Sequence, residues 1–177
     1  MLRGVNVGGH AVIKMDALRN LYLSLKFQDP RTYVQSGNVI FKSGERNQKL
    51  IAARIQQAIQ KEFACSPEVI LRTLPQLRVV VSRNPFAKRA NIEPGKLLVS
   101  FLASDPVKDA QEKLRVFADY PEELHLVGRE LFIYFPYGAG KSKLPWSRMD
   151  KVLLTPGTAR NWNSVNKMLA IAEQLES

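Results

Sequence analysis

Cysteine and histidine are scarce in this chain of 177 residues, which has one cysteine and two histidines. The single cysteine, Cys65, cannot form an intrachain disulfide and excludes zinc or iron–sulfur sites built from several cysteines. His10 and His125 lie far apart, and no HExxH, CxxC or EF-hand pattern occurs. The sequence therefore predicts no metal site and no cofactor, and its cysteine usage suits the reducing cytosol.

Long apolar runs are also lacking. The longest, at residues 97–103, is interrupted by Ser100 and is far shorter than the ~18 residues that a membrane-spanning helix needs. The N-terminus begins Met1-Leu2-Arg3-Gly4, without the apolar segment of a secretory signal. We therefore expect a cytoplasmic protein that contacts no membrane. The composition, 45% hydrophobic and 24% charged, is that of a globular protein and excludes collagen, coiled coil and wholesale disorder.

Acidic residues are few in the first half of the chain. Residues 1–89 carry 15 Lys and Arg against 5 Asp and Glu, a net charge of +10, whereas residues 90–177 carry 11 against 11. Such an asymmetry favours an anionic partner attracted over long range. The alternative is a solvated basic surface that only aids solubility.

Hydrophobic periodicity predicts an α+β chain. We expect helices at residues 11–25, 50–63, 75–81, 106–117 and 163–175, and strands at residues 31–35, 39–41, 68–72, 96–103, 123–127 and 131–135. Gly37-Asn38, between two β-rich runs, is typical of a tight hairpin turn.

The order of these elements defines two halves. The first half reads β-α-β-β-α-β, the split βαβ or ferredoxin-like order, and the second reads β-α-β-β followed by helices. We predict a ferredoxin-like half at residues 1–89 and a second one at residues 95–177. Both have antiparallel sheets, and the second lacks its last strand and ends in a C-terminal helix.

This order brings two separate segments to one edge of the sheet. Strands one and two of the first half run in the same direction, so the loop after strand one lies beside the turn between strands two and three. Residues 3–9 and 35–38 should therefore be neighbours. The edge would combine backbone N–H groups, flexible glycines and side-chain amides.

Several segments carry a family resemblance. They are residues 2–9, 32–39, 84–86, 138–144 and 158–165, which occur in order and cover essentially the whole chain. They resemble the bacterial "domain of unknown function 1697" family. The resemblance implies two ferredoxin-like halves, the second without its last strand, and it implies no established activity, substrate or cofactor.

The start of the chain departs from that family pattern. Family members usually carry several apolar residues before the Leu-Arg-Gly segment, where this sequence has only Met1. A strand needs about five residues. Two explanations stand: the native chain starts upstream of Met1, or its first strand is weakened.

The glycine-rich residues 138–142 do not form a nucleotide-binding P-loop. The Walker pattern requires a glycine at the position of Phe135, and Pro145 interrupts the helix that should follow Lys141.

The loop after the first strand is the better anion candidate. Its residues are Arg3, Asn6, Gly8, Gly9 and Lys14. Adjacent glycines let the backbone approach a ligand, and a helix N-terminus attracts negative charge. Alternatively, the glycines only form a turn and Asn6 satisfies loop amides.

Two further segments complete the predicted ligand-binding set. Gln35, Ser36 and Asn38 belong to the neighbouring turn, where turn formation is favoured over a serine nucleophile. Arg160 and Asn161 precede the last helix. An arginine there opposes the helix dipole unless an anion or carboxylate compensates, so Arg160 is either an anion contact or part of a buried ion pair.

The sequence thus favours a binding module for a phosphate-bearing ligand, a nucleotide or nucleic acid. One alternative is an enzyme acting on a small anionic metabolite, with Arg3, Lys14 and Arg160 as anion clamps and Asp16 or His10 as the base. The other is a non-catalytic scaffold or oligomer whose edge strands pair between chains. No residue is assigned as catalytic.

Overall fold

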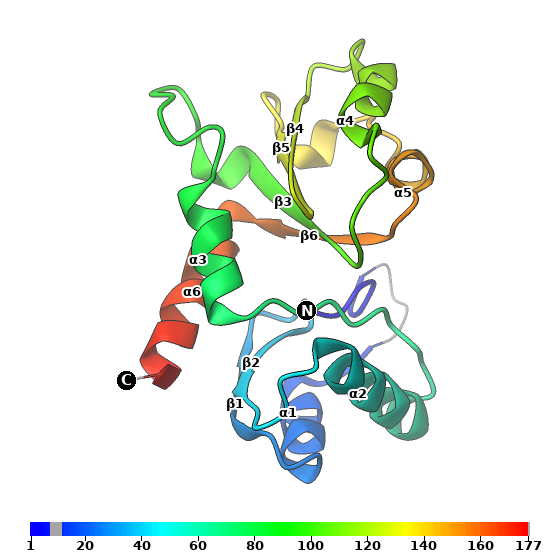
Figure 1. The fold of residues 1–177 in the computed structure, drawn as a ribbon, viewed down its shortest axis with the longest axis vertical. Helices are drawn as coiled ribbons and strands as arrows, with labels where there is room; N and C mark the ends of the chain where they lie inside the picture. Colours follow the sequence, from blue (N-terminus) through cyan, green and yellow to red (C-terminus); the bar gives the residue numbers. More distant parts are fainter. Residues whose placement is uncertain (8–11, 177) are drawn as a thin grey trace. The chain divides into compact units, whose positions relative to one another are not determined.

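The structure, a computed structural model, describes residues 1–7 and 12–176 and divides into two compact units (Figure 1). Unit 1 is Met1–Leu74 with Met168–Ser177, and unit 2 is Pro75–Lys167. These units differ from the predicted domains, 1–89 and 95–177, at both boundaries. Helix α3 (Leu74–Ser82) lies in unit 2 except for its first residue, and helix α6 (Trp162–Glu176) begins in unit 2 and ends in unit 1.

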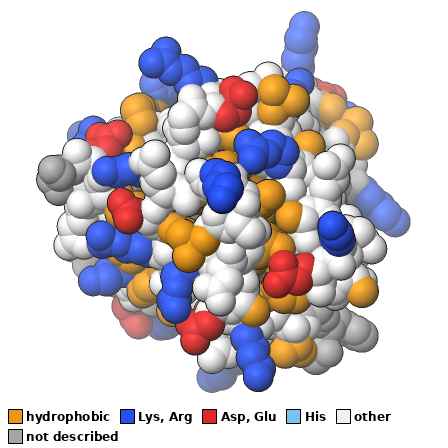
Figure 2. Space-filling model, turned by 90° about the horizontal axis from the view of Figure 1, so that it is seen from below, with side chains coloured by type: hydrophobic (Ala, Val, Ile, Leu, Met, Phe, Trp, Pro, Cys, Tyr) orange, Lys and Arg blue, Asp and Glu red, His pale blue; other side chains and the backbone are white. Residues whose placement is uncertain are grey.

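The basic excess is shared between the units. Unit 1 carries 11 Lys and Arg against 7 Asp and Glu, a net charge of +4, and unit 2 carries 15 against 9, a net charge of +6. On the face drawn in Figure 2, Lys and Arg side chains are dispersed among acidic and apolar ones. The charge of the first half of the sequence therefore does not by itself mark unit 1 as the site of an anionic ligand.

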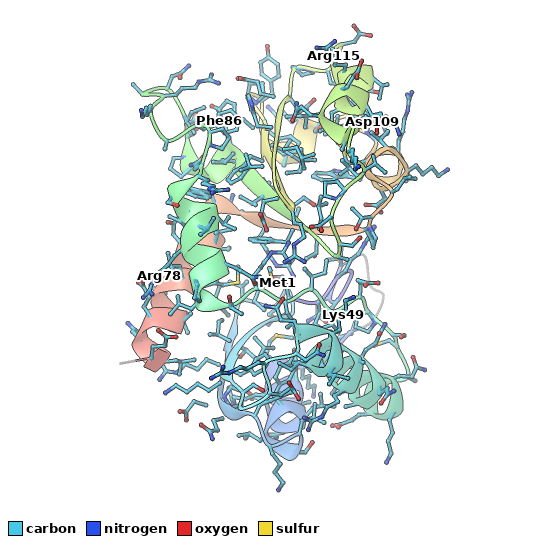
Figure 3. The ribbon with its side chains drawn as sticks, viewed as in Figure 1. Met1, Lys49, Arg78, Phe86, Asp109 and Arg115 are labelled. Atoms are coloured by element: carbon cyan, nitrogen blue, oxygen red, sulfur yellow. The ribbon has the colours of Figure 1, made fainter. Side chains whose placement is uncertain are left out.

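Unit 1 places helices beside a two-stranded antiparallel sheet. Its elements are α1 (Met15–Ser24), β1 (Gln28–Tyr33), β2 (Asn38–Lys42) and α2 (Gln48–Phe63), together with the end of α6. The strands predicted at the start of the chain and at residues 68–72 are reduced to one antiparallel bridge between Leu2 and Val69. A backbone hydrogen bond of 2.9 Å from the Ile70 N–H to the carbonyl of Met1, labelled in Figure 3, flanks this bridge.

The β1–β2 hairpin differs from the predicted tight turn at Gly37-Asn38. Tyr33 pairs with Asn38, so the connection is the four residues 34–37. Near the other end of β1, the register shifts between Gln28 and Arg31, where Asp29 has a left-handed φ of 47°.

An aromatic cluster forms part of the core of unit 1. The ring of Phe27 lies 5.7 Å from that of Tyr22 and 4.5 Å from that of Phe41. Ile55 and Ile59 of α2 are fully buried in the same core. The hydrophobic periodicity of α1 and α2 points Tyr22, Ile55 and Ile59 inward, as the sequence predicts.

Unit 2 contains a four-stranded antiparallel sheet with the spatial order β4-β5-β3-β6. Its elements include β3 (Leu97–Leu102), α4 (Ala110–Lys113), η2 (Leu114–Phe117), β4 (Glu123–Val127), β5 (Glu130–Tyr134), α5 (Trp146–Leu153) and β6 (Gly157–Asn161). The prediction that the second half lacks its last strand is wrong, because β6 pairs with β3 over all five of its residues.

The predicted helix from Pro106 is also shorter in the structure. It begins at Ala110, and after one α-helical turn it continues as the 3-10 segment η2 to Phe117. Asp109, labelled in Figure 3, occupies the N-cap position of α4.

Both faces of this sheet are covered. Leu102, Leu131 and Ile133 face one side, where they pack with residues of α4, η2 and α5. On the other side, Phe132 lies 6.2 Å from Trp162, measured between ring centroids. Phe86, labelled in Figure 3, contacts the rings of His125 at 5.0 Å and Tyr134 at 5.8 Å. These contacts explain why a loop residue such as Phe86 is buried.

Strand β6 packs closely against β3 at Gly157. A Cβ atom at this position would lie 2.5 Å from the Ser100 Oγ and 3.1 Å from the Leu102 Cδ2. Real Cβ contacts are longer, so any side chain would force these neighbours to move.

We expect Gly157→Ala to lower the free energy of unfolding by about 1–3 kcal/mol, the usual cost of overpacking. Adding Ser100→Ala removes the nearest atom and should recover part of the loss. Gly140→Ala is the matched control, because a Cβ there meets nothing within 4 Å. Thermal denaturation compares the variants, and equal stability of Gly157→Ala and Gly140→Ala would contradict the close contact.

Candidate functional site

The structure brings the two predicted edge segments of unit 1 together. The Leu2 N–H donates a 3.0 Å hydrogen bond to the Gly37 carbonyl. We call the surface formed by residues 2–7, 12–14 and 34–38 the rim. The predicted site residues Gly8 and Gly9, and the candidate base His10, lie outside the described residues.

The side chain of Asn6 joins three segments of the rim. Its Oδ1 accepts a 2.8 Å hydrogen bond from the Ile13 N–H, and its Nδ2 donates to the carbonyls of Ile13 and Gln35, each at 2.9 Å. Both amide hydrogens are thereby used. The φ of Asn6 is 57°, a left-handed conformation that asparagine tolerates better than most residues. Asn6 thus satisfies backbone groups, as in the alternative interpretation.

Helix α1 starts directly beside this junction. Lys14, adjacent to Ile13, is the N-cap residue and is exposed, and no side chain caps the helix from that position. Asp16 in the first turn forms a 2.8 Å ion pair with Arg19. An uncapped helix start carries partial positive charge on its N–H groups. The rim therefore combines this helix end with the ammonium group of Lys14.

The turn between β1 and β2 is held by Asn38. This side chain is completely buried, and its Nδ2 donates to the Tyr33 carbonyl at 3.2 Å and to the Ser36 Oγ at 2.9 Å. An amide cannot remove a proton from a serine hydroxyl, so this contact does not activate Ser36 as a nucleophile. Gln35 is exposed, and its carbonyl is the acceptor for Asn6.

Apolar side chains, which no pattern in the sequence singles out, also line the rim. Val7, Val12 and Val34 are 64%, 75% and 49% exposed. Val34 has a φ of 49°, which is rare for a β-branched residue. Arg3 is half-buried, and its N–H donates to the Glu68 carbonyl at 3.0 Å. The rim therefore offers apolar as well as polar contacts.

The remaining predicted site residues, Arg160 and Asn161, belong to β6 of unit 2, and α6 starts after them. Arg160 is buried, and its Nη1 donates to the Thr158 Oγ1 at 2.7 Å and to the Ala159 carbonyl at 2.8 Å. Burial lowers the pKa of Arg160 to about 10, because desolvation penalises the charged form. Arg160 thus precedes the last helix, as the sequence predicts, but it does so as a residue of strand β6.

Both polar atoms of the Asn161 side chain form hydrogen bonds within unit 2. Its Nδ2 donates to the Gly95 carbonyl at 2.8 Å, and its Oδ1 accepts a 3.0 Å hydrogen bond from the Asn163 N–H. The second bond caps the first turn of α6, which is a common role of asparagine.

Residues 1–7 and 12–176 lack two kinds of site. This part of the chain contains no group of three or more His, Cys, Asp or Glu side chains arranged to hold a metal ion. None of its helices has the length and apolar character needed to span a bilayer.

Gly37 allows the two edge segments to approach. Its φ is 69°, and a Cβ atom there would lie 2.8 Å from the Leu2 Cβ. We expect Gly37→Ala to destabilise unit 1 by more than the 1–2 kcal/mol that a left-handed alanine costs alone. Gly4→Ala is the matched control, since its φ is 71° but a Cβ meets nothing within 4 Å. Thermal denaturation of both variants checks this, and an equal loss in the two would contradict the steric argument.

Asn6→Gly removes the three side-chain hydrogen bonds while keeping a residue that tolerates positive φ. At about 0.5–1.5 kcal/mol per bond, we expect unit 1 to lose roughly 1.5–4.5 kcal/mol. Hydrogen exchange measures this locally: amide protection at Ile13 and in residues 34–38 should fall, while protection of β3 and β5 in unit 2 stays unchanged. Unchanged protection at Ile13 would contradict the role of Asn6.

The sequence and the fold can be compared with those of known proteins. A search of curated proteins found no match. Among solved structures, the chain is similar to the conserved bacterial protein SP0830 from Streptococcus pneumoniae, with a TM-score of 0.71 and 18% identity over 97% of this chain and 96% of that one. At this identity the likeness shows the fold alone. The family model "Protein of unknown function (DUF1697)" matches residues 1–132. The chain therefore belongs to the DUF1697 family, as its sequence segments indicated.

Proposed function

We propose that the rim of unit 1 binds a phosphate-bearing ligand, a nucleotide or a nucleic acid segment. The observation that carries this proposal is the set of three hydrogen bonds made by Asn6, because they fix the uncapped start of α1 beside the β1–β2 turn. A phosphate group bound at a helix N-terminus accepts hydrogen bonds from free N–H groups and is favoured by the helix dipole.

The side chains of the rim support an organic phosphate over the inorganic ion. Lys14 supplies a positive charge beside the helix start, which adds to a dipole effect of about 0.3–1 kcal/mol at an exposed site. Val7, Val12 and Val34 supply exposed apolar surface. Such surface favours a ligand that has a base or another apolar group near its phosphate.

The enzyme alternative has less support in the described residues. A general base must reach the reacting group of the substrate. The carboxylate of Asp16, one of the two candidates, pairs with Arg19 at 2.8 Å. The other candidate, His10, lies outside the described residues. We therefore prefer binding to catalysis.

The scaffold alternative requires accessible strand edges, and two edges are protected. At β4, the Leu126 N–H donates to the Gln111 Oε1 at 3.1 Å. At β1, the shift in register and Pro30 interrupt the ladder. Bulges, prolines and side chains that cover backbone groups disfavour pairing between chains.

We also infer that both units follow the ferredoxin-like plan. In unit 2 the chain order β3-α4-β4-β5-α5-β6 and the spatial order β4-β5-β3-β6 support this inference. In unit 1 the support comes from the bridge between Leu2 and Val69, which occupies the place of the first and last strands.

A thermal-shift screen with pyrophosphate, ATP and a short oligonucleotide tests the proposed ligand class. A ligand at 100 times its Kd should stabilise the protein by about 2.7 kcal/mol. Lys14→Gln should abolish or strongly reduce the shift. Lys42→Gln is the matched control, because Lys42 is also exposed and lies at the end of β2 remote from the turn. No shift with any of the three probes, or equal shifts for the two variants, would refute binding at the rim.

A further inference from the structure

We propose that a second surface, in unit 2, binds single-stranded nucleic acid by stacking bases on exposed aromatic rings. This surface, which we call the aromatic loop, runs from the end of β5 into the first turn of α5 (Figure 1). Its residues are Tyr137, Lys141, Lys143, Trp146 and Arg148. It shares no residue with the rim, so the inference does not depend on the function proposed above.

The aromatic rings of this loop are exposed, unlike those of the neighbouring strand. Tyr137 is 71% exposed and Trp146 is 41% exposed, whereas Phe132 and Tyr134 of β5 are buried. Such exposure is unusual, because burying a large aromatic side chain normally stabilises the fold strongly. An exposed ring can stack on any base, because every base has a π-face.

Phe135 anchors both rings at the end of β5. It is completely buried, and its carbonyl accepts a 2.9 Å hydrogen bond from the Gly138 N–H, which closes a turn around Tyr137. The centroid of its ring lies 6.0 Å from that of Trp146. Tyr137 and Trp146 are therefore attached to the same buried residue, one through the backbone and one through ring contact.

The backbone between the two rings is fixed by successive short-range hydrogen bonds. The Lys141 N–H donates to the Gly138 carbonyl at 3.1 Å, and the Leu144 N–H donates to the Ser142 Oγ at 3.0 Å. Leu144 is buried and packs in the core of the unit. A loop that is already ordered loses less conformational entropy when it binds a partner.

Cationic side chains accompany the rings. Lys141, Lys143 and Arg148 are exposed, and residues 136–149 contain no Asp or Glu. The guanidinium of Arg148 lies 5.8 Å above the ring of Phe117, a cation–π distance. Asp150, two residues after Arg148, is the one acidic residue between positions 131 and 172. This excess of positive charge suits a phosphate backbone better than a basic partner.

The combination of these features identifies the class of partner. Aromatic platforms and cations are the two parts of single-strand binding sites, in which stacking holds the bases and Lys or Arg contacts the phosphates. A folded duplex would hide its base faces from Tyr137 and Trp146. The aromatic loop therefore fits a single strand.

Fluorescence anisotropy with a labelled dT12 oligonucleotide, repeated at several salt concentrations, tests this inference on the full chain. Tyr137→Ala should weaken binding about tenfold or more, as the loss of one stacked base does. The double change Lys141→Gln and Lys143→Gln should lower the slope of log K against log[salt] by about 1.4, or ~0.7 for each phosphate contact. Val116→Ala and Lys108→Gln, at exposed positions elsewhere in unit 2, should bind as the unchanged protein does.

A spectroscopic readout separates stacking from simple charge attraction. Stacking on Trp146 should quench tryptophan fluorescence when dT12 is added, and Trp146→Phe should remove that quenching. Poly-glutamate that competes equally well, or unchanged affinity of Tyr137→Ala, would overturn the inference. Loss of dT12 binding in Lys14→Gln, with the aromatic-loop variants unaffected, would also overturn it and would place nucleic acid at the rim instead.

Discussion

The carboxamide of Asn6 connects the separate segments of the rim, and the position of the start of α1 depends on it. It bonds to both backbone groups of Ile13 and to the carbonyl of Gln35, so one side chain sets where α1 starts relative to the β1–β2 turn. Regular strand pairing contributes little to holding this part of unit 1, because Leu2 and Val69 form a single β-bridge. The left-handed backbone conformation of Asn6 is one that asparagine adopts more readily than most residues.

The sequence predicted those parts of the fold that depend on periodicity or strand propensity. The apolar faces of α1, α2 and α6, and the strands β3, β4 and β5, follow from such patterns. Strand β6 could not be predicted this way. Its sequence, Gly-Thr-Ala-Arg-Asn, has little β propensity, and it is a strand because β3 pairs with it and Gly157 allows close approach.

The candidate site was predictable only in part. Reasoning from strand direction placed residues 3–9 beside residues 35–38, and the hydrogen bond between Leu2 and Gly37 agrees with that neighbourhood. The exposure of Val34 and its left-handed backbone left no signal in the sequence, because valine rarely adopts that conformation. The charge count along the sequence was also misleading about unit 1. Four basic residues of the first half of the chain, within residues 75–89, belong to unit 2.

The path of α6 affects how the protein is made. Unit 1 consists of the first 74 residues and the last ten, whereas unit 2 is continuous in the chain. During translation, all of unit 2 is therefore synthesised before the segment that completes unit 1. Unit 1 begins the chain, yet its final helical turns can pack only after every residue of unit 2 has been added.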